Sequence, residues 1–231
     1  MAQIDRSLIA ALPSFVGMGP EALDDVLAQA RPLRAPKGSA VFNQGQNAEE
    51  FFLLLHGRLR VTRITPQGEQ VVVRFVGPGD MFGVAMAIKS EIYPGTATAV
   101  VDSLALVWPN SAWTGLISRH PALALNTMGT LGARLQDSQT RILEMSTQQA
   151  EKRVAHAVLR LVNQAGRKTD EGILIDFPIS RQDIAEMTGT TLHTVSRIFS
   201  AWEEKGLVKG GRRRILVCDP HGLFMLTEKA D

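Results

Sequence analysis

At the start of the first 120 residues, apolar residues recur with the spacing of a helix. The pattern then changes to short runs in which apolar and polar residues alternate, as they do in strands. Two short helices are predicted over residues 6–12 and 20–30. In the alternating part, glycines from Gly45 to Gly79 recur every 11 or 12 residues. Short strands separated by turn residues at such intervals are typical of an antiparallel sandwich or barrel. The predicted strands are 40–42, 51–55, 59–64, 70–76, 98–101 and 104–108.

A single long helix is predicted from Pro121 to about Gln149. Its apolar positions form a narrow stripe that begins at Ala124 and alternates spacings of four and three residues, which is the pattern of a coiled-coil seam. The alternative is an amphipathic helix packed on its own domain. The narrow stripe, which lasts about three heptads, favours a homodimer. The predicted seam residues are Met128, Leu131, Leu135, Ser138, Ile142 and Met145.

Residues 180–214 have the pattern of a helix, a tight turn, a second helix and a basic hairpin. Ser180 can cap the first helix, with Asp183 three residues later as in a capping box. Gly189 lies where the chain must turn sharply, because glycine enters a left-handed conformation without steric cost. The second helix is predicted over 192–204. Its inward face is formed by Val195, Ile198, Phe199 and Trp202.

The outward face of this second helix carries hydrogen-bonding side chains near its start, and such side chains read base edges in a major groove. The hairpin that follows holds four cations within six residues, from Lys209 to Arg214. The pattern therefore predicts a winged helix-turn-helix that binds DNA, and it argues against a helical hairpin in an ordinary core. The predicted base-reading residues are His193, Thr194, Ser196 and Arg197. The predicted phosphate contacts are Arg181, Thr191, Arg212, Arg213 and Arg214.

Length and composition fit two modest domains of an α+β fold. The chain has 231 residues, of which 45% are hydrophobic, enough for real cores. We expect an effector domain over 1–120, a dimerisation helix and hinge over 121–149, and a DNA-binding domain over 150–231.

The net charge is only +2, but its distribution is uneven. Residues 1–149 hold 12 Lys+Arg against 12 Asp+Glu, whereas residues 150–231 hold 13 against 11. The excess positive charge therefore lies in the C-terminal part, and we expect phosphate attraction to come from the local basic hairpin.

Several classes of protein are disfavoured by the sequence. Cys218 is the one cysteine, which excludes a disulfide framework or a multi-cysteine zinc or iron–sulfur site and fits a reducing cytoplasm. No apolar run is long enough for a membrane span, and the N-terminal stretch does not resemble a signal peptide. We find no nucleophile–base pairing, metal-ligand spacing or phosphate-binding glycine loop. We therefore expect a cytoplasmic protein that is not an enzyme and has no membrane partner.

The chain resembles the CRP/FNR family of bacterial transcription regulators nearly from end to end. PhePheLeuLeuLeuHisGlyArgLeuArgVal (51–61) is similar to the front of that family's cyclic-nucleotide-binding β-roll. GlyProGlyAspMetPheGly (77–83) is similar to the start of its phosphate-binding cassette. The resemblance implies an N-terminal antiparallel β-roll, a long dimerisation helix and a C-terminal winged helix-turn-helix. It also implies a homodimer on a pseudo-palindromic duplex, with RNA polymerase as a further partner.

The cassette departs from that of the cAMP-binding members of the family. Those members carry a glutamate after the last cassette glycine and later an arginine for the cyclic phosphate. Here Val84 follows Gly83, and no arginine occurs between Arg74 and Arg119. A buried phosphate needs a charge-assisted partner such as a bidentate arginine. We therefore expect an effector other than cAMP.

The replacement for the cassette is apolar and suits a hydrophobic ligand or haem. TyrProGlyThrAlaThrAlaVal (93–100) and LeuHisThrValSerArg (192–197) are similar to nitric-oxide-responsive denitrification regulators, in which haem is the suspected sensor. His56, His120 and His156 are candidate haem ligands, and no metal-ligand set is assigned. The predicted effector-pocket residues are Gly83, Val84, Met86, Tyr93, Thr96 and Thr98.

Other functions remain open at this point. The effector could be an unusual nucleotide, a small apolar metabolite or absent altogether. The winged helix could contact protein in place of DNA. In the family's reading motif, a glutamate stands where this chain has His193, and a neutral histidine can accept or donate, so the base read there is left open. Arg197 is predicted to pair with guanine O6 and N7.

Overall fold

The computed structural model describes residues 6–228, and the chain forms two compact units. The first comprises the residues up to Arg63 together with Phe75–Asp137. The second comprises Ile64–Arg74 together with the residues from Ser138 onwards. One boundary between the units thus lies inside the long helix. The domain ranges expected from the sequence (1–120, 121–149 and 150–231) stay predictions.

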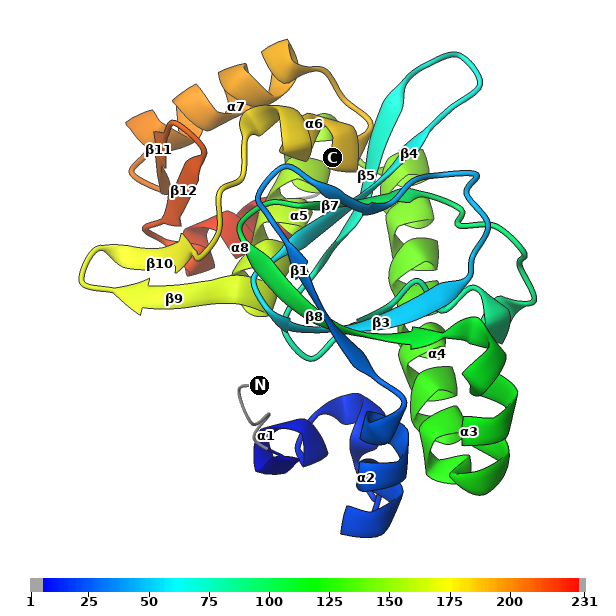
Figure 1. Cartoon of the computed structure of the whole chain (residues 1–231). Coiled ribbons are helices and arrows are strands. Elements are labelled where there is room, and N and C mark those ends of the chain that lie inside the picture. The colour runs from blue at the N-terminus through cyan, green and yellow to red at the C-terminus, as the bar shows by residue number, and fades with distance from the viewer. Residues whose placement is uncertain (1–5, 229–231) are drawn as a thin grey trace. The chain divides into compact units, whose positions relative to one another are not determined.

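The N-terminal part is a roll of two four-stranded sheets, with strand orders β1-β8-β3-β6 and β2-β7-β4-β5 (Figure 1). All six predicted strands are present, with ends shifted by at most two residues. The strand bounds are β1 Arg31–Ala35, β2 Ala40–Phe42, β3 Glu50–His56, β4 Leu59–Ile64, β5 Gln70–Val76, β6 Met81–Phe82, β7 Thr96–Ala99 and β8 Ser103–Pro109.

Two strands were not predicted, and each has a physical reason. The β1 sequence ArgProLeuArgAla has one large apolar residue and a proline, so it lacks the alternation of a half-buried strand. The strand lies at a sheet edge, where a missing backbone N–H is tolerated. The other, β6, has only two residues and is held by its pairing with β3, in which Phe82 lies opposite Phe52.

The central strand β3 is buried on both faces, because successive side chains point to opposite sides of a sheet. Phe51 and Leu53 pack in one core with Trp108 and the N-terminal helices. Phe52 and Leu54 pack in a second core, which lies between the two sheets. The roll is therefore three layers thick: helices, sheet and sheet.

Three helices close the outer layer: α1 (Arg6–Ala10), α2 (Pro20–Ala28) and α3 (Trp113–Arg119). The indole Nε1 of the fully buried Trp108 donates to the Val26 carbonyl of α2 at 2.7 Å. This hydrogen bond satisfies the polar atom of a core tryptophan and ties α2 to the sheet.

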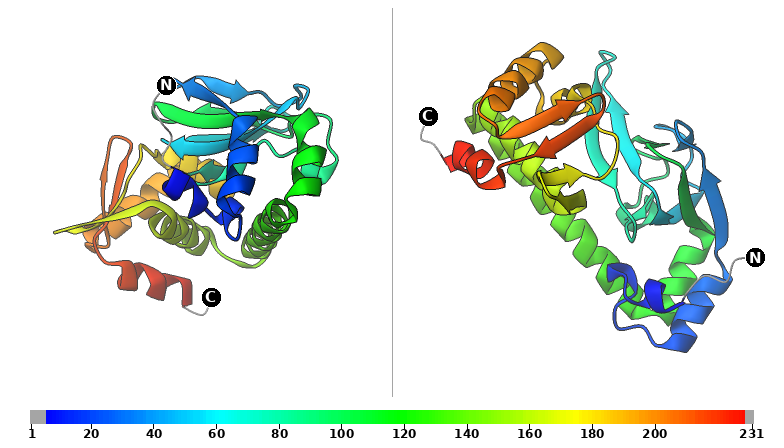
Figure 2. Two further views of the ribbon diagram at one scale, coloured as in Figure 1. Left: turned by 60° about the horizontal axis from the view of Figure 1, so that its bottom comes forward. Right: turned by 90° about the vertical axis from the view of Figure 1, so that its left-hand side faces the viewer.

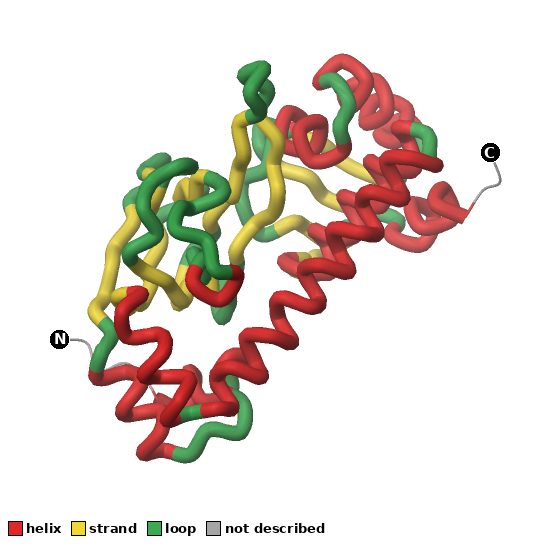
Figure 3. The backbone as a smooth tube through the Cα atoms, turned by 90° about the vertical axis from the view of Figure 1, so that its right-hand side faces the viewer, coloured by secondary structure: helices red, strands yellow, loops and turns green. Residues whose placement is uncertain are grey.

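The long helix α4 (Pro121–Thr147) runs without a break (Figure 3). It is followed by α5 (Ala150–Ala165), which begins after the N-cap Gln149. The observed helix α4 therefore ends two residues before the predicted end, and Gln148 and Gln149 form the hinge to α5.

The second unit holds a four-stranded sheet of order β11-β12-β10-β9 and four further helices (Figure 2). The β9–β10 hairpin and α8 were not predicted, because their segments are short and lack a clear hydrophobic period. The bounds are β9 Gly166–Thr169, β10 Gly172–Ile175, α6 Arg181–Thr188, α7 Leu192–Glu204, β11 Val208–Gly211, β12 Arg214–Val217 and α8 Pro220–Glu228.

The helix-turn-helix has the predicted local structure. Ser180 and Asp183 form the capping box of α6, in which each side chain accepts from the other residue's backbone N–H. Gly189 ends α6 at φ 60°, the left-handed region in which a Cβ would be strained. The predicted bounds of α7 are confirmed. Its inward residues Val195, Ile198, Phe199 and Trp202 are buried.

Candidate DNA-binding and effector sites

The start of α7 presents its polar side chains outward. The Thr191 hydroxyl caps the helix by accepting from the Thr194 backbone N–H at 3.1 Å, and the two hydroxyls lie 2.9 Å apart. His193 and Arg197 are exposed, and Thr194 and Ser196 are partly buried. The structure thus brings the four predicted base-reading residues together on one turn and a half of helix, opposite the buried face.

The β11–β12 hairpin, here called the wing, lies beside α7 in the second unit (Figure 2). Its turn residues Arg212 and Arg213 and the following Arg214 are all exposed. Arg213 has φ 57°, and its carbonyl accepts from the Ile179 backbone N–H just before α6. The wing turn is therefore anchored next to the N-terminus of α6, where backbone N–H groups favour an anion.

Arg181, the first residue of α6, is not a freely extended side chain. Its Nη2 donates to Glu203 Oε1 at 2.7 Å, and its guanidinium lies 5.3 Å from the centre of the Phe199 ring. Glu203 was not predicted, because no local pattern in the sequence indicates which acidic side chain reaches the start of α6.

Two polar contacts hold the helix-turn-helix against α5, and a third joins α5 to the hinge. Trp202 donates from Nε1 to Glu151 at 2.8 Å. Arg153 donates to the carbonyl of Thr188 at the end of α6 and to that of Gln148 in the hinge. The contacts of Trp202 with Glu151 and of Arg153 with Thr188 join residues far apart in the chain, so no local sequence pattern predicts them.

A bidentate ion pair joins α4 to α5. Arg160 donates through two nitrogens to the two carboxylate oxygens of Glu144, at 2.6 and 3.0 Å. The Glu144 side chain is only 8% exposed. This bidentate geometry fixes the end of α4 against the first helix of the DNA-binding part.

The predicted effector-pocket residues are spread over the two cores and the surface of the roll. Val84 is buried in the core beneath the N-terminal helices, whereas Tyr93 is buried in the core between the sheets. Thr96 and Thr98 alternate with the inward residues of β7 and so face away from the intersheet core. Met86 is 41% exposed.

Aromatic side chains occupy the space near Gly83 and Tyr93. Phe42 stacks on Tyr93 with ring centres 3.9 Å apart, and Phe52 stacks on Phe82 at 4.9 Å. The Tyr93 hydroxyl donates to the Glu50 carbonyl at 2.7 Å. Burial raises the pKa of Tyr93 above its usual value, which keeps this hydroxyl protonated. Its donor is therefore already committed to the protein backbone.

Arg134 connects the cassette to the long helix within the first unit. From α4 it donates to the Met81 carbonyl at 2.6 Å, two residues before Gly83. Burial lowers the pKa of this guanidinium, and the nearby Asp80 carboxylate opposes that shift. The contact places the cassette backbone next to the helix that carries the predicted seam.

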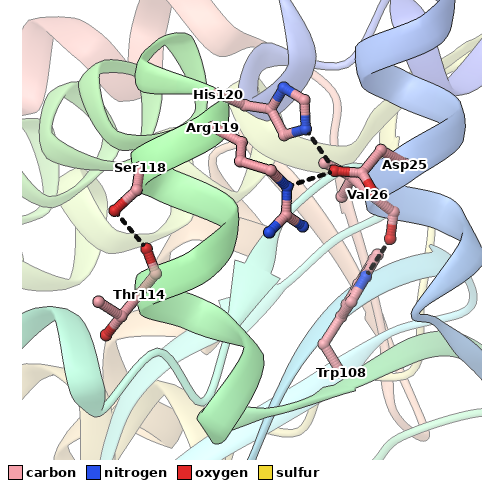
Figure 4. A network of polar contacts seen from close by, with 7 residues as sticks. All are labelled: Asp25, Val26, Trp108, Thr114, Ser118, Arg119 and His120. Atoms are coloured by element: carbon pink, nitrogen blue, oxygen red, sulfur yellow. Dashed lines mark hydrogen bonds and ion pairs between the residues drawn. The ribbon is translucent and has the colours of Figure 1, made fainter.

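The three candidate haem ligands lie on or next to three different elements. His56 is exposed at the end of β3, and His156 lies on α5, 3.5 Å from the Gln148 side chain. His120 Nε2 lies 2.7 Å from the Asp25 carboxylate, which also accepts from Arg119 (Figure 4). Among residues 6–228, no cluster of three or more His, Cys, Asp or Glu has a metal-binding arrangement. Haem iron takes only one or two axial side chains, so the lack of a three-ligand cluster does not decide for or against haem, which stays a prediction.

Asp25→Asn should remove part of the acid sensitivity of the protein. Hydrogen bonds from His120 and Arg119 hold the pKa of Asp25 below its usual value. When the pKa of a carboxyl group is lower in the folded than in the unfolded state, the group stabilises the fold at pH values above its unfolded-state pKa. This stabilisation is lost as the pH falls through the folded-state pKa. Between about pH 5 and pH 3, the Tm of the wild type should therefore fall more steeply than that of the variant.

The matched control for this experiment is Asp24→Asn, one residue earlier, whose side chain pairs with the exposed Arg6. Its Tm should keep the wild-type pH dependence. Equal slopes for all three proteins would show that the Asp25 contacts carry no pH-dependent stability.

The predicted seam residues differ in exposure. Met128, Leu135 and Ile142 are 68%, 61% and 62% exposed, and Met145 is 45% exposed. Ser138 is exposed, but Leu131 is partly buried. Leu125, which was not predicted, is 67% exposed and precedes Met128 by three residues. The exposed apolar stripe therefore starts at Leu125.

No helix within residues 6–228 is both long and apolar enough to cross a membrane.

Comparisons with known proteins agree with this architecture. Residues 32–120 match the family described as "Cyclic nucleotide-binding domain", and residues 152–225 match the "Crp-like helix-turn-helix domain". The chain is 30% identical over 199 residues to the "Cyclic AMP receptor protein" of Thermus thermophilus, covering 86% of this chain and 89% of the relative.

Two further similarities span most of the molecule. The "Transcriptional activator protein FnrA" of Stutzerimonas stutzeri is 28% identical, over 90% of this chain and 84% of the relative. The solved structure of FixK2 from Bradyrhizobium japonicum has a TM-score of 0.76 at 22% identity and covers 87% of this chain and 99% of its own, which shows a shared fold. These relatives are transcription regulators and not enzymes. The chain is a member of the CRP/FNR family of DNA-binding transcription regulators, with a ligand-sensing cyclic-nucleotide-binding domain and a Crp-like helix-turn-helix.

Proposed function

We propose that this regulator binds a pseudo-palindromic duplex as a homodimer and is controlled by an effector other than cAMP. The observation that carries the proposal is the start of α7. Its inward face is fully packed, its cap is formed by Thr191, and Arg197 is exposed next to the polar positions 193, 194 and 196. A packed helix whose exposed turn is polar suits insertion into a major groove.

Phosphate contacts would come from the edge formed by the wing and the start of α6. The three wing arginines are exposed, and Arg213 is hydrogen-bonded through its carbonyl to Ile179. Thr191 lies at the N-terminus of α7, which also favours an anion. These groups would fix the register of the reading helix on the duplex.

The exposed stripe on α4 supports the homodimer. Large apolar side chains rarely stay in water along one face of a long helix, so the stripe favours a second copy of this chain as its partner. Two reading helices would then lie about 34 Å apart, which is one turn of DNA. The protein would act in the cytoplasm, with RNA polymerase as a further partner.

For the effector, the cassette favours a ligand other than cAMP. Val84 stands where the cAMP-binding members carry a glutamate, and it is buried beneath the N-terminal helices. Nitric oxide sensing through haem, expected from sequence similarity, stays a hypothesis for this domain. The effector class stays open between nitric oxide bound to haem, a nucleotide and a small apolar metabolite.

Fluorescence anisotropy on a TTG-N8-CAA duplex tests the proposal. We expect salt-dependent binding of the wild-type dimer and no gain in affinity on adding cAMP. An absence of salt-dependent binding to any duplex would favour the alternative, in which the winged helix contacts protein. A gain with cAMP would overturn the proposed effector class, and a gain only with haem and nitric oxide would restore the gas-sensing hypothesis.

Arg197→Ala should weaken binding to the specific duplex by about 1–3 kcal/mol and relax the choice of base at one position. A bidentate contact to guanine is lost, whereas phosphate contacts remain. The measurement is anisotropy on the specific duplex and on single-base variants. Lys205→Ala, at the other end of α7, is the control and should leave base choice unchanged. Equal losses on specific and random duplexes would contradict a reading role for Arg197.

A further inference from the structure

One acidic side chain lies inside the basic edge that would face the duplex. Glu203, near the end of α7, accepts from Arg181 at 2.7 Å. The two side chains are 34% and 32% exposed, so the ion pair is accessible from solvent. An anion at this position opposes the approach of DNA phosphates.

The geometry around Arg181 is fixed on three sides. Its backbone begins α6 directly after the N-cap Ser180, its guanidinium lies against Phe199, and one edge pairs with Glu203. A planar guanidinium held in this way loses little conformational freedom on binding a further oxygen. The remaining edge is thus oriented by Glu203 before any phosphate arrives.

The wing leaves room for this ion pair at Gly210 on β11. A Cβ at Gly210 would overlap Glu203 Oε1 and would lie 3.1 Å from Arg181 Nη2. The backbone there does not need glycine for a left-handed conformation, since Gly210 is not among the positive-φ glycines. The lack of a side chain at Gly210 therefore allows the Glu203 carboxylate to lie close to the wing.

We propose that Glu203 is a specificity-determining residue that acts as an internal substitute for a DNA phosphate. It holds Arg181 in one orientation, which suits the register that α7 imposes at the specific site. On other DNA sequences, no base contacts fix the register of α7. The Glu203 carboxylate then repels phosphates that approach Arg181 from positions other than the one occupied in the specific complex. Since non-specific binding is almost entirely electrostatic, the penalty falls mainly on non-specific complexes. This inference rests on the proposed DNA-binding function.

Two variants test the proposal from opposite directions. Glu203→Gln removes the negative charge and keeps the shape of the side chain. Gly210→Ala keeps the charge but displaces the carboxylate from Arg181. Both should tighten binding to a scrambled duplex, and Glu203→Gln should steepen its log–log salt dependence by about one unit. At salt concentrations between 50 and 200 mM, the ratio of specific to non-specific affinity should be about threefold lower in the variants than in the wild type.

Each variant has a matched control in the next residue. Glu204→Gln removes the same charge from the neighbouring, exposed position. Gly211→Ala adds the same methyl group where its nearest neighbour, Arg214 Cβ, would lie at an ordinary 3.6 Å. Both controls should keep the wild-type affinity ratio and salt slope.

The proposal is overturned if Glu203→Gln and Glu204→Gln change the ratio equally, because the effect would then be one of net charge alone. It is also overturned if Gly210→Ala leaves the ratio unchanged while circular dichroism shows a native fold. A wild-type protein without salt-dependent DNA binding would instead refute the proposed function. The two failures are therefore distinguished by the wild-type measurement.

Discussion

Leu135→Arg should make the protein monomeric and lower its affinity for the palindromic duplex by about 100-fold or more. Leu135 lies at the middle of the exposed stripe on α4, between Met128 and Ile142. In a dimer, each Leu135 would face its counterpart across the seam. Two guanidinium groups in that position would be buried without a counter-ion, a cost that a three-heptad seam does not offset.

The loss of DNA affinity follows from the loss of linked binding. A dimer engages its second half-site intramolecularly, at an effective concentration that raises the overall affinity by about 10²–10⁴. Light scattering would measure the mass in solution, and anisotropy would measure affinity for full and half-site duplexes. We expect the variant to keep the wild-type affinity for a half-site, because α7 and the wing are unchanged.

Gln136→Arg is the control, since residue 136 is exposed, adjacent to the stripe and already polar. It should stay dimeric and bind the full duplex as the wild type does. A Leu135→Arg protein that remains dimeric would contradict the seam, and dimerisation would then have to use another surface.

Local signals were sufficient to predict the reading helix from the sequence. The bounds of α7 follow from a cap at Thr191, a turn at Gly189 and four apolar residues with helical spacing, all within 14 residues. Each of these features acts within one or two turns of helix, so it can be recognised in the sequence without knowledge of any distant contact. Alternation and glycine spacing likewise predicted six strands, whose observed ends lie within two residues of the predicted ones.

The orientation of the side chains on β7 was harder to predict, because it depends on which face of the strand is inward. Thr96 and Thr98 were grouped with Tyr93 by proximity in the sequence. The structure gives the inward face of β7 to Ala97 and Ala99 instead. A one-residue change of register reverses both faces of a strand, and the sequence of a short strand with small residues does not decide between them.

Contacts between distant acidic and basic residues were also beyond sequence reasoning. Glu203 and Glu144 are two of many acidic residues on predicted polar faces, where solvation is the usual role. Only the tertiary structure shows that Glu203 meets Arg181 and that Glu144 meets Arg160. These pairs differ in burial, and burial determines how much each one matters for stability.

Arg160→Met should lower the free energy of unfolding by about 3 kcal/mol, because the Glu144 carboxylate would stay buried without its partner. Replacing both residues, as Glu144→Leu with Arg160→Met, should recover most of that loss, since apolar pairs of similar volume are often as stable as a buried ion pair. Urea unfolding of the full chain, followed by circular dichroism, gives the four free energies of the double-mutant cycle.

The exposed pair Arg167–Asp176 is the matched control, with a similar distance of 3.0 Å but side chains 57% and 55% exposed. Arg167→Met should therefore cost less than about 1 kcal/mol. If Arg160→Met costs no more than Arg167→Met, the bidentate pair does not hold α4 against α5. The other outcome is that Arg160→Met costs about 3 kcal/mol and the double replacement restores stability. If the double replacement then also changes the effector control of DNA binding, the ion pair is kept for its geometry. An apolar pair supplies the same stability but not the fixed bidentate orientation.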